Sequence, residues 1–234
     1  MKKNNRFFAI IGALDAEIDE YLKHLKNHKK NIWKGFIFHE GRFCGKNVVI
    51  VKSGVGKVFA AMTTQKLIDE YNPLSVIFTG VAGGLNEKLK IGDIVVGKDC
   101  VQHDLDAIKL GFLRGAIPYT DYRFFESDTT LYTHALSARV EHAIYGGRIL
   151  TGDQFLTKRK MKKYAYLTDD LEGDVVEMEG ASVGQVCFLN DIPFLIIRTI
   201  SDKADQEGPD NFNKFLSEVA KNSFQMVQHI LKKL

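Results

Sequence analysis

Three short and almost uninterrupted apolar runs constrain the fold of this chain more than any other feature. They are FFAIIGAL at 7–14, LSVIFTGVAGGL at 74–85 and IPFLIIRTISD at 192–202. A strand without polar alternation has both faces buried, which is typical of a parallel or mixed sheet that helices cover on two sides. The three runs therefore predict the central strands of such a sheet.

The segments between these runs predict further strands and helices. Strands are predicted as a hairpin at 36–54 and as single strands at 91–104, 146–153 and 175–179. Apolar spacing and good helix formers predict helices at 18–25, 56–71, 127–143, directly after 179 and over the C-terminal 212–231. Because strands and helices mostly alternate, the expected fold class is α/β, a three-layer α/β/α sandwich with a central mixed sheet, as one domain over residues 1–234.

Composition and charge argue against several classes of protein. The 234 residues carry a net charge of only +3 and contain no run of about 18 apolar residues, so we expect no membrane span. The three cysteines form no CxxC pair and the histidines no HExxH, which predicts a reduced, cytoplasmic protein without metal or cofactor. The basic run KRKMKK at 158–163 is compatible with a nucleic-acid patch, but a solvated helix or loop is the favoured interpretation.

Two glycine-containing segments superficially match phosphate-binding motifs. SGVGKV at 53–58 lacks the first glycine of a P-loop and has Val58 where the motif needs serine or threonine. GVAGG at 80–84 is not the GxGxxG of a dinucleotide site, and no GxSxG elbow is present. The sequence therefore gives little support to nucleotide-phosphate or serine-hydrolase chemistry.

Charged side chains follow several of the predicted strands. Glu17 follows the first run, Glu177 and Glu179 lie in VVEME, and Arg198 and Asp202 lie at the end of the last run. In open α/β sheets the carboxyl ends of the strands hold the ligand, so these residues predict acid–base chemistry on a small polar molecule. Structural alternatives stay open, because a glutamate also stabilises a first helical turn, a buried arginine needs a carboxylate, and an aspartate also caps turns.

Several motifs together resemble a known enzyme family. IIGALDAEI, VKSGVGKVFAA, FTGVAGGL, LKIGDIVV, HDLDA, TGDQF, VVEMEGA and IPFLIIRTISDKAD occur in the order of bacterial 5′-methylthioadenosine/S-adenosylhomocysteine nucleosidases. The resemblance covers about residues 6–232 and is weakest at 119–145. It implies a nucleoside phosphorylase-like fold and hydrolysis of the N-glycosidic bond of an adenine nucleoside, without a cofactor.

The resemblance also implies catalytic roles. Glu17 would activate the water, and Asp202 would protonate or hydrogen-bond the purine at N7. Glu179 would hold the ribose hydroxyls, and Arg198 would organise the water and the carboxylates. These residue types suit the reaction, since an acid neutralises the leaving purine while a carboxylate favours positive charge that develops on the sugar.

Further matching positions imply substrate contacts. Met178 would lie beneath the sugar, Phe155 would stack on the purine, and the backbone of Leu156 would read the purine edge. Gly83 lies in the glycine turn that lets the backbone approach the nucleoside, and Ser201 is expected to contact the substrate. The pocket for the 5′ substituent would be lined by Leu14, Val55 and Phe212.

A second copy of the chain is expected to complete this pocket. The resemblance implies a homodimer in which Ala107, Leu110 and Pro118 reach into the partner's site. The sequence departs from the family at Val81, where many relatives have serine, and at Leu14, where methionine is frequent. These departures concern the preferred 5′ substituent rather than the glycosidic chemistry.

Three alternative functions stay open. A sibling nucleosidase would act on an aminodeoxyfutalosine-type nucleoside. A phosphorolytic enzyme would need anion-binding groups, which the acidic GALDAEI segment does not offer. A non-catalytic nucleoside-binding protein would not need an acid aimed at the leaving group.

Overall fold

The computed structural model describes residues 6–157, 162–204 and 208–234, although Leu216 has the only described side chain between 208 and 220. The strands are β1 (Phe8–Gly12), β2 (Lys26–Trp33), β3 (Phe36–Phe43), β4 (Lys46–Lys52), β5 (Ser75–Gly84), β6 (Ile94–Gln102), β7 (Phe125–Glu126), β8 (Ile144–Thr151), β9 (Val175–Glu177) and β10 (Phe194–Asp202). The α-helices are α1 (Asp15–Lys23), α2 (Lys57–Tyr71), α3 (Thr129–Leu136), α4 (Tyr166–Asp169), α5 (Gly180–Leu189) and α6 (Gly208–Lys233), and η1 (Ile108–Leu110) and η2 (Lys162–Tyr164) are short 3₁₀ turns.

The strands form one mixed sheet in the order β10-β6-β8-β9-β5-β1-β4-β3-β2, with β7 beside β6. The three apolar runs of the sequence are β1, β5 and β10, and β5 lies parallel between the other two. Because β10 pairs with both β5 and β6, the strands β10, β6, β8, β9 and β5 close into a ring. This closure brings the ends of β5, β9 and β10 together.

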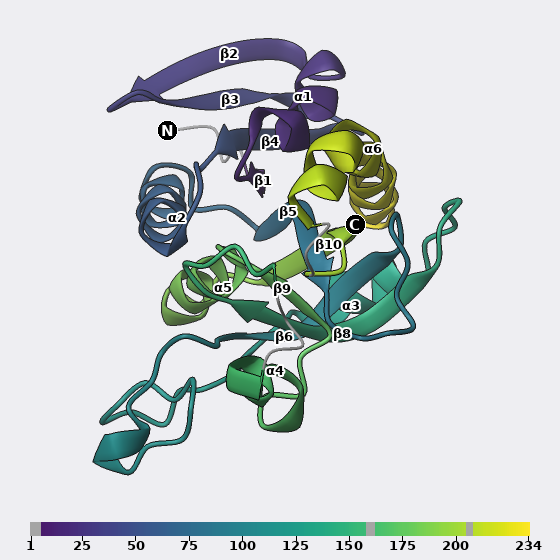
Figure 1. Cartoon of the computed structure of the whole chain (residues 1–234). Helices are drawn as coiled ribbons and strands as arrows, with labels where there is room; N and C mark the ends of the chain where they lie inside the picture. Colours follow the sequence, from purple (N-terminus) through teal and green to yellow (C-terminus); the bar gives the residue numbers. More distant parts are fainter. Residues whose placement is uncertain (1–5, 158–161, 205–207) are drawn as a thin grey trace.

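Helices cover both faces of the sheet, as the sequence predicts (Figure 1). Residues of α2 and α5, such as Leu67 and Val183, are buried in one hydrophobic core with one face of the strands. Residues of α1, α3 and α6 are buried in a second core on the opposite face, with Tyr21, Leu131 and Ile230 as examples. Hydrophobic cores on both faces of one mixed sheet confirm the three-layer α/β/α prediction. None of the described helices has the length and hydropathy of a membrane span.

Strand β2 is an element that the sequence did not predict. Its segment KNHKKNIW has no alternating apolar residues, and nearly every residue in it is exposed. Among the described strands it pairs only with β3, at the outer edge of the sheet, where lysines discourage pairing with other chains. The apolar periodicity that identifies buried strands is therefore missing.

The helix predicted over 127–143 is wrong in its length. Asp128 begins α3 by accepting the amide of Leu131, and the helix ends at Leu136. The Ser137 hydroxyl donates to the carbonyl of His134, so its side chain competes with continuation of the helix. The chain then turns into β8 at Ile144.

The strand predicted at VVEME is also shorter than expected. It ends at Glu177 because the carboxylate of this residue accepts the amides of Glu179 and Gly180, where α5 begins. Glu179 is therefore the residue before a helix rather than the end of a strand.

Candidate active site

One cavity of about 260 Å³ is lined by most of the predicted site residues. Its lining includes ten of them: Leu14, Glu17, Val55, Gly83, Phe155, Leu156, Met178, Glu179, Ser201 and Asp202. The remaining lining residues are Ala13, Val81, Ala82, Gln154, Val176, Glu177 and Ala204. The cavity lies where β1, β5, β9 and β10 end, as the rule for ligand sites in α/β sheets predicts.

Glu17 is held in the first turn of α1 with its carboxylate facing the cavity. The amides of Ala13 and Leu14 donate to its Oε2 at 2.6 and 3.0 Å, and the amide of Val81 donates to its Oε1 at 3.0 Å. Burial raises the pKa of Glu17, while the charge of Arg198 and the three amides act in the opposite direction. Glu17 is thus both a helix-capping residue and a buried carboxyl group whose pKa is raised, which is common for groups at functional sites.

Gly80 leaves the space that the Glu17 carboxylate occupies. A Cβ at Gly80 would lie 2.5 Å from Glu17 Oε1 and 2.9 Å from Cδ. We expect Gly80→Ala to displace the carboxylate and to lower turnover by about 10- to 100-fold, because misplaced catalytic groups lose their reactive geometry. Steady-state kinetics would measure the loss. Gly84→Ala on the same strand is the control, since its Cβ meets Ile200 at an ordinary 3.5 Å, and equal activity of the two variants would contradict the prediction.

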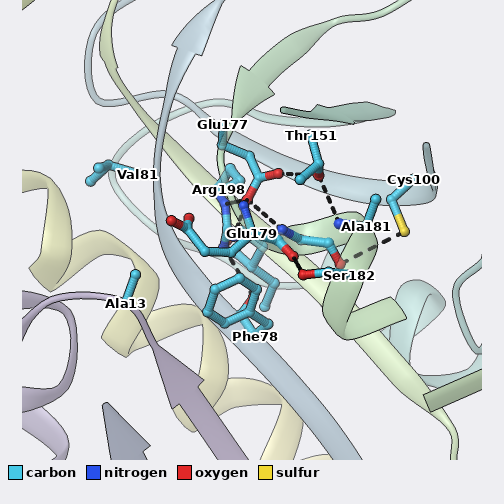
Figure 2. A network of polar contacts seen from close by, with 12 residues as sticks. Ala13, Phe78, Val81, Cys100, Thr151, Glu177, Glu179, Ala181, Ser182 and Arg198 are labelled. Atoms are coloured by element: carbon cyan, nitrogen blue, oxygen red, sulfur yellow. Dashed lines mark hydrogen bonds and ion pairs between the residues drawn. The ribbon is translucent and has the colours of Figure 1, made fainter. Parts of the chain in front are cut away.

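Arg198 and Glu177 form a buried ion pair beside the cavity (Figure 2). Arg198 is 1% exposed, and its Nη2 and Nε donate to Glu177 Oε2 at 2.5 and 3.2 Å. Its Nη1 donates to the carbonyl of Ile197 at 3.0 Å. Arg198 does not line the cavity, and its direct contacts are those of a buried arginine paired with a carboxylate, the structural alternative named from the sequence. Its role in organising the water stays a prediction.

Glu177 lines the cavity, and the sequence left its role open. Its carboxylate accepts the Thr151 hydroxyl, the Arg198 guanidinium and the amides of Glu179 and Gly180. It therefore fixes the backbone that carries Glu179. The sequence signal for this residue is a second glutamate, two residues before Glu179, in an otherwise apolar run. Its role could not be predicted because its side-chain partners Thr151 and Arg198 come from distant strands.

Glu179 faces the cavity from the start of α5. Its Oε1 accepts the amide of Gly56 at 2.8 Å, immediately before α2. Burial and the neighbouring charge of Glu177 raise the pKa of Glu179 to about 8. Burial therefore favours the neutral form of this side chain, whereas positive charge on a bound ligand would favour the carboxylate.

We expect Glu179→Gln to change how stability depends on pH. The raised pKa means that the folded protein keeps a proton that the unfolded chain releases above about pH 4.5. Wild-type unfolding free energy should thus fall by up to about 1.4 kcal/mol per pH unit from this one group, until pH passes about 8. Urea unfolding across this window should show the variant gaining on the wild type as pH rises. Glu126→Gln, at an exposed position, should run parallel to the wild type; a parallel curve for Glu179→Gln would contradict the assignment.

Asp202 ends β10 and is 3% exposed. The Ser201 hydroxyl donates to its Oδ2 at 2.9 Å, and the amide of Ala204 donates to its Oδ1 at 2.7 Å. Gly83 lies opposite, because a Cβ there would come within 3.0 Å of Asp202 Oδ1. Asp202 therefore caps the turn after β10, as the structural alternative from the sequence proposed, and the same carboxyl group lines the cavity.

The other walls of the cavity are apolar. Phe155 and Leu156 follow β8, Met178 precedes α5, and Leu14 and Val55 add aliphatic surface. Phe155 is about half exposed at the rim, whereas Leu156 is buried. A flat aromatic ring and aliphatic side chains next to carboxyl groups suit a ligand with a flat apolar base and a polar sugar.

Besides Arg198, three predicted residues lie outside the cavity, and a fourth has its side chain outside the described residues. Ala107, Leu110 and Pro118 lie in the segment between β6 and β7, which extends away from the body of the protein (Figure 1), and they do not line the cavity of their own chain. Leu110 is 68% exposed. Phe212 lies in α6, but its side chain is outside the described residues, as are residues 158–161 of the basic run.

Comparisons with known proteins show the family to which the chain is similar. The family model described as the phosphorylase superfamily matches residues 7–232. The 5′-methylthioadenosine/S-adenosylhomocysteine nucleosidase of Marinomonas sp. (strain MWYL1) is 37% identical, with 95% of this chain and 97% of the relative covered.

Solved structures give the same result. The 5′-methylthioadenosine/S-adenosylhomocysteine nucleosidase of Neisseria meningitidis in complex with methylthio-immucillin-A is 36% identical with a TM-score of 0.92, covering 98% of this chain and 100% of that one. The futalosine hydrolase of Helicobacter pylori strain 26695 is 31% identical with a TM-score of 0.92, covering 98% and 99%. Full-length identity to the nucleosidases, a shared fold and a carboxyl-lined cavity at the strand ends lead to one conclusion: this chain belongs to the 5′-methylthioadenosine/S-adenosylhomocysteine nucleosidases of the phosphorylase superfamily.

Proposed function

We propose that this chain hydrolyses the N-glycosidic bond of 5′-methylthioadenosine, S-adenosylhomocysteine and related 5′-substituted adenine nucleosides, and releases adenine. The observation that carries the proposal is the convergence of Glu17, Glu179 and Asp202 on one cavity with the Phe155 ring at its rim. Carboxyl groups in different hydrogen-bonding surroundings can divide the roles of base, sugar ligand and acid.

In the proposed reaction Glu17 accepts a proton from a water molecule that attacks the anomeric carbon. The bond between this carbon and purine N9 breaks, and its electron pair moves into the purine. Asp202 supplies a proton at N7, so adenine leaves as a neutral base. Glu179 holds the ribose hydroxyls and stabilises positive charge that develops on the sugar. The proton gained by Glu17 returns to Asp202 through solvent, which completes the cycle.

The charges of the cavity favour water over phosphate as the attacking group. Glu17, Glu177, Glu179 and Asp202 all line it, and among its described lining residues there is no lysine or arginine. An incoming phosphate dianion would meet carboxyl groups, whereas phosphate sites are built from cationic or amide donors. A phosphorolytic reaction is therefore disfavoured.

We propose a homodimer whose partner completes the pocket for the 5′ substituent. In one chain this pocket has Leu14 and Val55 as walls, and the exposed segment with Ala107, Leu110 and Pro118 supplies apolar residues that its own cavity does not use. Light scattering should give the mass of a dimer. A fully active monomer would contradict this part of the proposal.

A nucleoside of the aminodeoxyfutalosine type is the second candidate substrate. It is favoured by the futalosine hydrolase of Helicobacter pylori, which has the same TM-score as the Neisseria meningitidis nucleosidase. Val81 places an aliphatic side chain in the cavity lining. Val81 is also one of the positions where the sequence departs from the family, and these departures concern the preferred 5′ substituent.

We also propose a cytoplasmic location and a role in methionine salvage, through removal of methylthioadenosine. The three cysteines Cys44, Cys100 and Cys187 are free thiols, which suits a reducing compartment.

Adenine release from the three nucleosides tests the proposed function. Chromatography should show adenine formed from 5′-methylthioadenosine and S-adenosylhomocysteine, with turnover that does not depend on added phosphate. Adenine formed from the aminodeoxyfutalosine-type nucleoside alone would establish the second candidate. Binding of the nucleosides without any adenine release would support a non-catalytic protein.

A further inference from the structure

A cluster of three charged residues lies beside the cavity without lining it. Lys57 Nζ lies 2.7 Å from Asp104 Oδ1 and 4.0 Å from Asp153 Oδ2. The Lys57 amide donates to Asp153 Oδ1 at 2.9 Å, and the Asp153 amide donates to Asp104 Oδ2 at 3.0 Å. We call Lys57, Asp104 and Asp153 the Lys57 cluster. Side-chain exposure is 19% for Lys57 and 20% for Asp104, so water screens this ion pair less than pairs on the open surface.

The Lys57 cluster joins three segments that are far apart in the sequence. Lys57 begins α2, Asp104 follows β6, and Asp153 begins the segment after β8 that carries Phe155 and Leu156. The residue before Lys57 is Gly56, whose amide donates to Glu179 Oε1. The first turn of α2 is therefore hydrogen-bonded on one side to the carboxyl group at the sugar position and on the other to the segment with the aromatic wall.

The Lys57 cluster pairs two carboxylates with the single positive charge of Lys57. Asp153 accepts the Lys57 amide at the N-terminus of a 15-residue helix, where negative charge is favourable. Burial acts to raise the pKa of Asp104, but hydrogen bonds from Lys57 and the Asp153 amide outweigh it and lower the pKa overall. Removing the lysine side chain would leave Asp104 and Asp153 as two adjacent carboxylates without their shared cation. Of the cluster's contacts, the segment after β8 would then keep only the hydrogen bonds from the Lys57 and Asp153 amides, and its position would be less firmly fixed.

His103 also supports the segment after β8, at Gly152. A Cβ at Gly152 would overlap the buried ring of His103, so the backbone before Asp153 lies directly against that ring. The segment that carries Phe155 therefore has fixed contacts at Gly152 and at Asp153.

We propose that Lys57, Asp104 and Asp153 are positioning residues that hold the purine-binding wall in register with Glu179, so that base and sugar are recognised together. The inference rests on the proposed function, because it assigns the base to the Phe155 wall and the sugar to Glu179. None of the three residues lines the cavity, so none is placed to touch the reacting atoms. Their loss should therefore weaken ligand binding far more than the chemical step.

The test compares Lys57→Met and Asp104→Asn with the wild type. For each variant we expect KM for 5′-methylthioadenosine to rise about tenfold while kcat changes less than about threefold. Lys57→Arg should restore most of the affinity. The double variant should be no worse than the poorer single variant, because both remove the same contact. Lys66→Met is the matched control, since it breaks an exposed pair with Glu70 on the same helix and should leave KM unchanged.

Calorimetric titration of adenine into the same variants separates this inference from the proposed function. A roughly tenfold loss of adenine affinity in Lys57→Met, without loss in Lys66→Met, would support positioning even if the wild type released no adenine from any nucleoside. Unchanged KM and unchanged adenine affinity in Lys57→Met would overturn the inference. A lower melting temperature with wild-type affinity would also overturn it, because the cluster would then only stabilise the fold.

Discussion

Asp202→Asn should lower the release of adenine from 5′-methylthioadenosine by about 10²- to 10⁴-fold while the protein remains folded. Asparagine keeps the shape of the side chain and an oxygen that accepts the Ala204 amide, so the turn after β10 should persist. It has no acidic proton to give to the purine, and the leaving group would depart as an anion. Chromatographic measurement of adenine under single-turnover conditions checks the effect on the bond-breaking step.

Asp128→Asn is the matched control for this variant. Asp128 also accepts a backbone amide, that of Leu131, but it begins α3 and does not line the cavity. Asparagine is as good a helix cap as aspartate, so turnover and stability should stay near those of the wild type. Turnover of Asp202→Asn close to that of Asp128→Asn would remove Asp202 from the role of the acid.

Glu17→Gln should lower kcat by about 10²- to 10³-fold and change nucleoside affinity by less than about threefold. The amide cannot accept the proton of the attacking water. The glutamate accepts backbone amides on both oxygens, so the NH₂ group of glutamine must face one of these donors, and a modest loss of stability should accompany the loss of turnover. Steady-state kinetics and nucleoside titration together separate the two effects.

The pH dependence of turnover gives a second check on Glu17. Burial raises the pKa of this carboxyl group, and a base acts in its ionised form, so wild-type turnover should fall as pH drops through the raised pKa. Glu17→Gln should lose this acidic limb. Glu20→Gln, which alters an exposed pair with Lys23 one turn later, should retain it. A loss of affinity with normal kcat in Glu17→Gln would contradict the role as base.

Much of the sheet could be predicted because its central strands are buried on both faces. The three apolar runs became β1, β5 and β10, which are neighbours in the sheet. β2 escaped prediction because an exposed edge strand needs no apolar pattern. Closure of the ring through the pairing of β10 with β5 and β6 depends on contacts between distant strands, and local periodicity carries no information about them.

The residues of the candidate site could be predicted in part, as the strands could. Glu17, Glu179 and Asp202 could be predicted because charged residues in or directly after buried strands are unusual and the strand ends converge. The partners that hold them could not be predicted. Gly56 and Glu179 are 123 residues apart in the chain, and the hydrogen bond between them exists only because α2 and α5 begin side by side. The sequence indicated that Arg198 needs a carboxylate partner, but it did not show which glutamate this is; in the structure the partner is Glu177.

Incorporation of oxygen from ¹⁸O-labelled water tests the central claim most directly. The reaction would be run on 5′-methylthioadenosine in labelled water with excess inorganic phosphate, and the sugar product analysed by mass spectrometry as soon as it forms. Attack by a water molecule activated by Glu17 predicts one labelled oxygen at the anomeric carbon of free methylthioribose and no sugar 1-phosphate. Formation of the sugar 1-phosphate would show that phosphate is the nucleophile and would contradict the proposed hydrolysis.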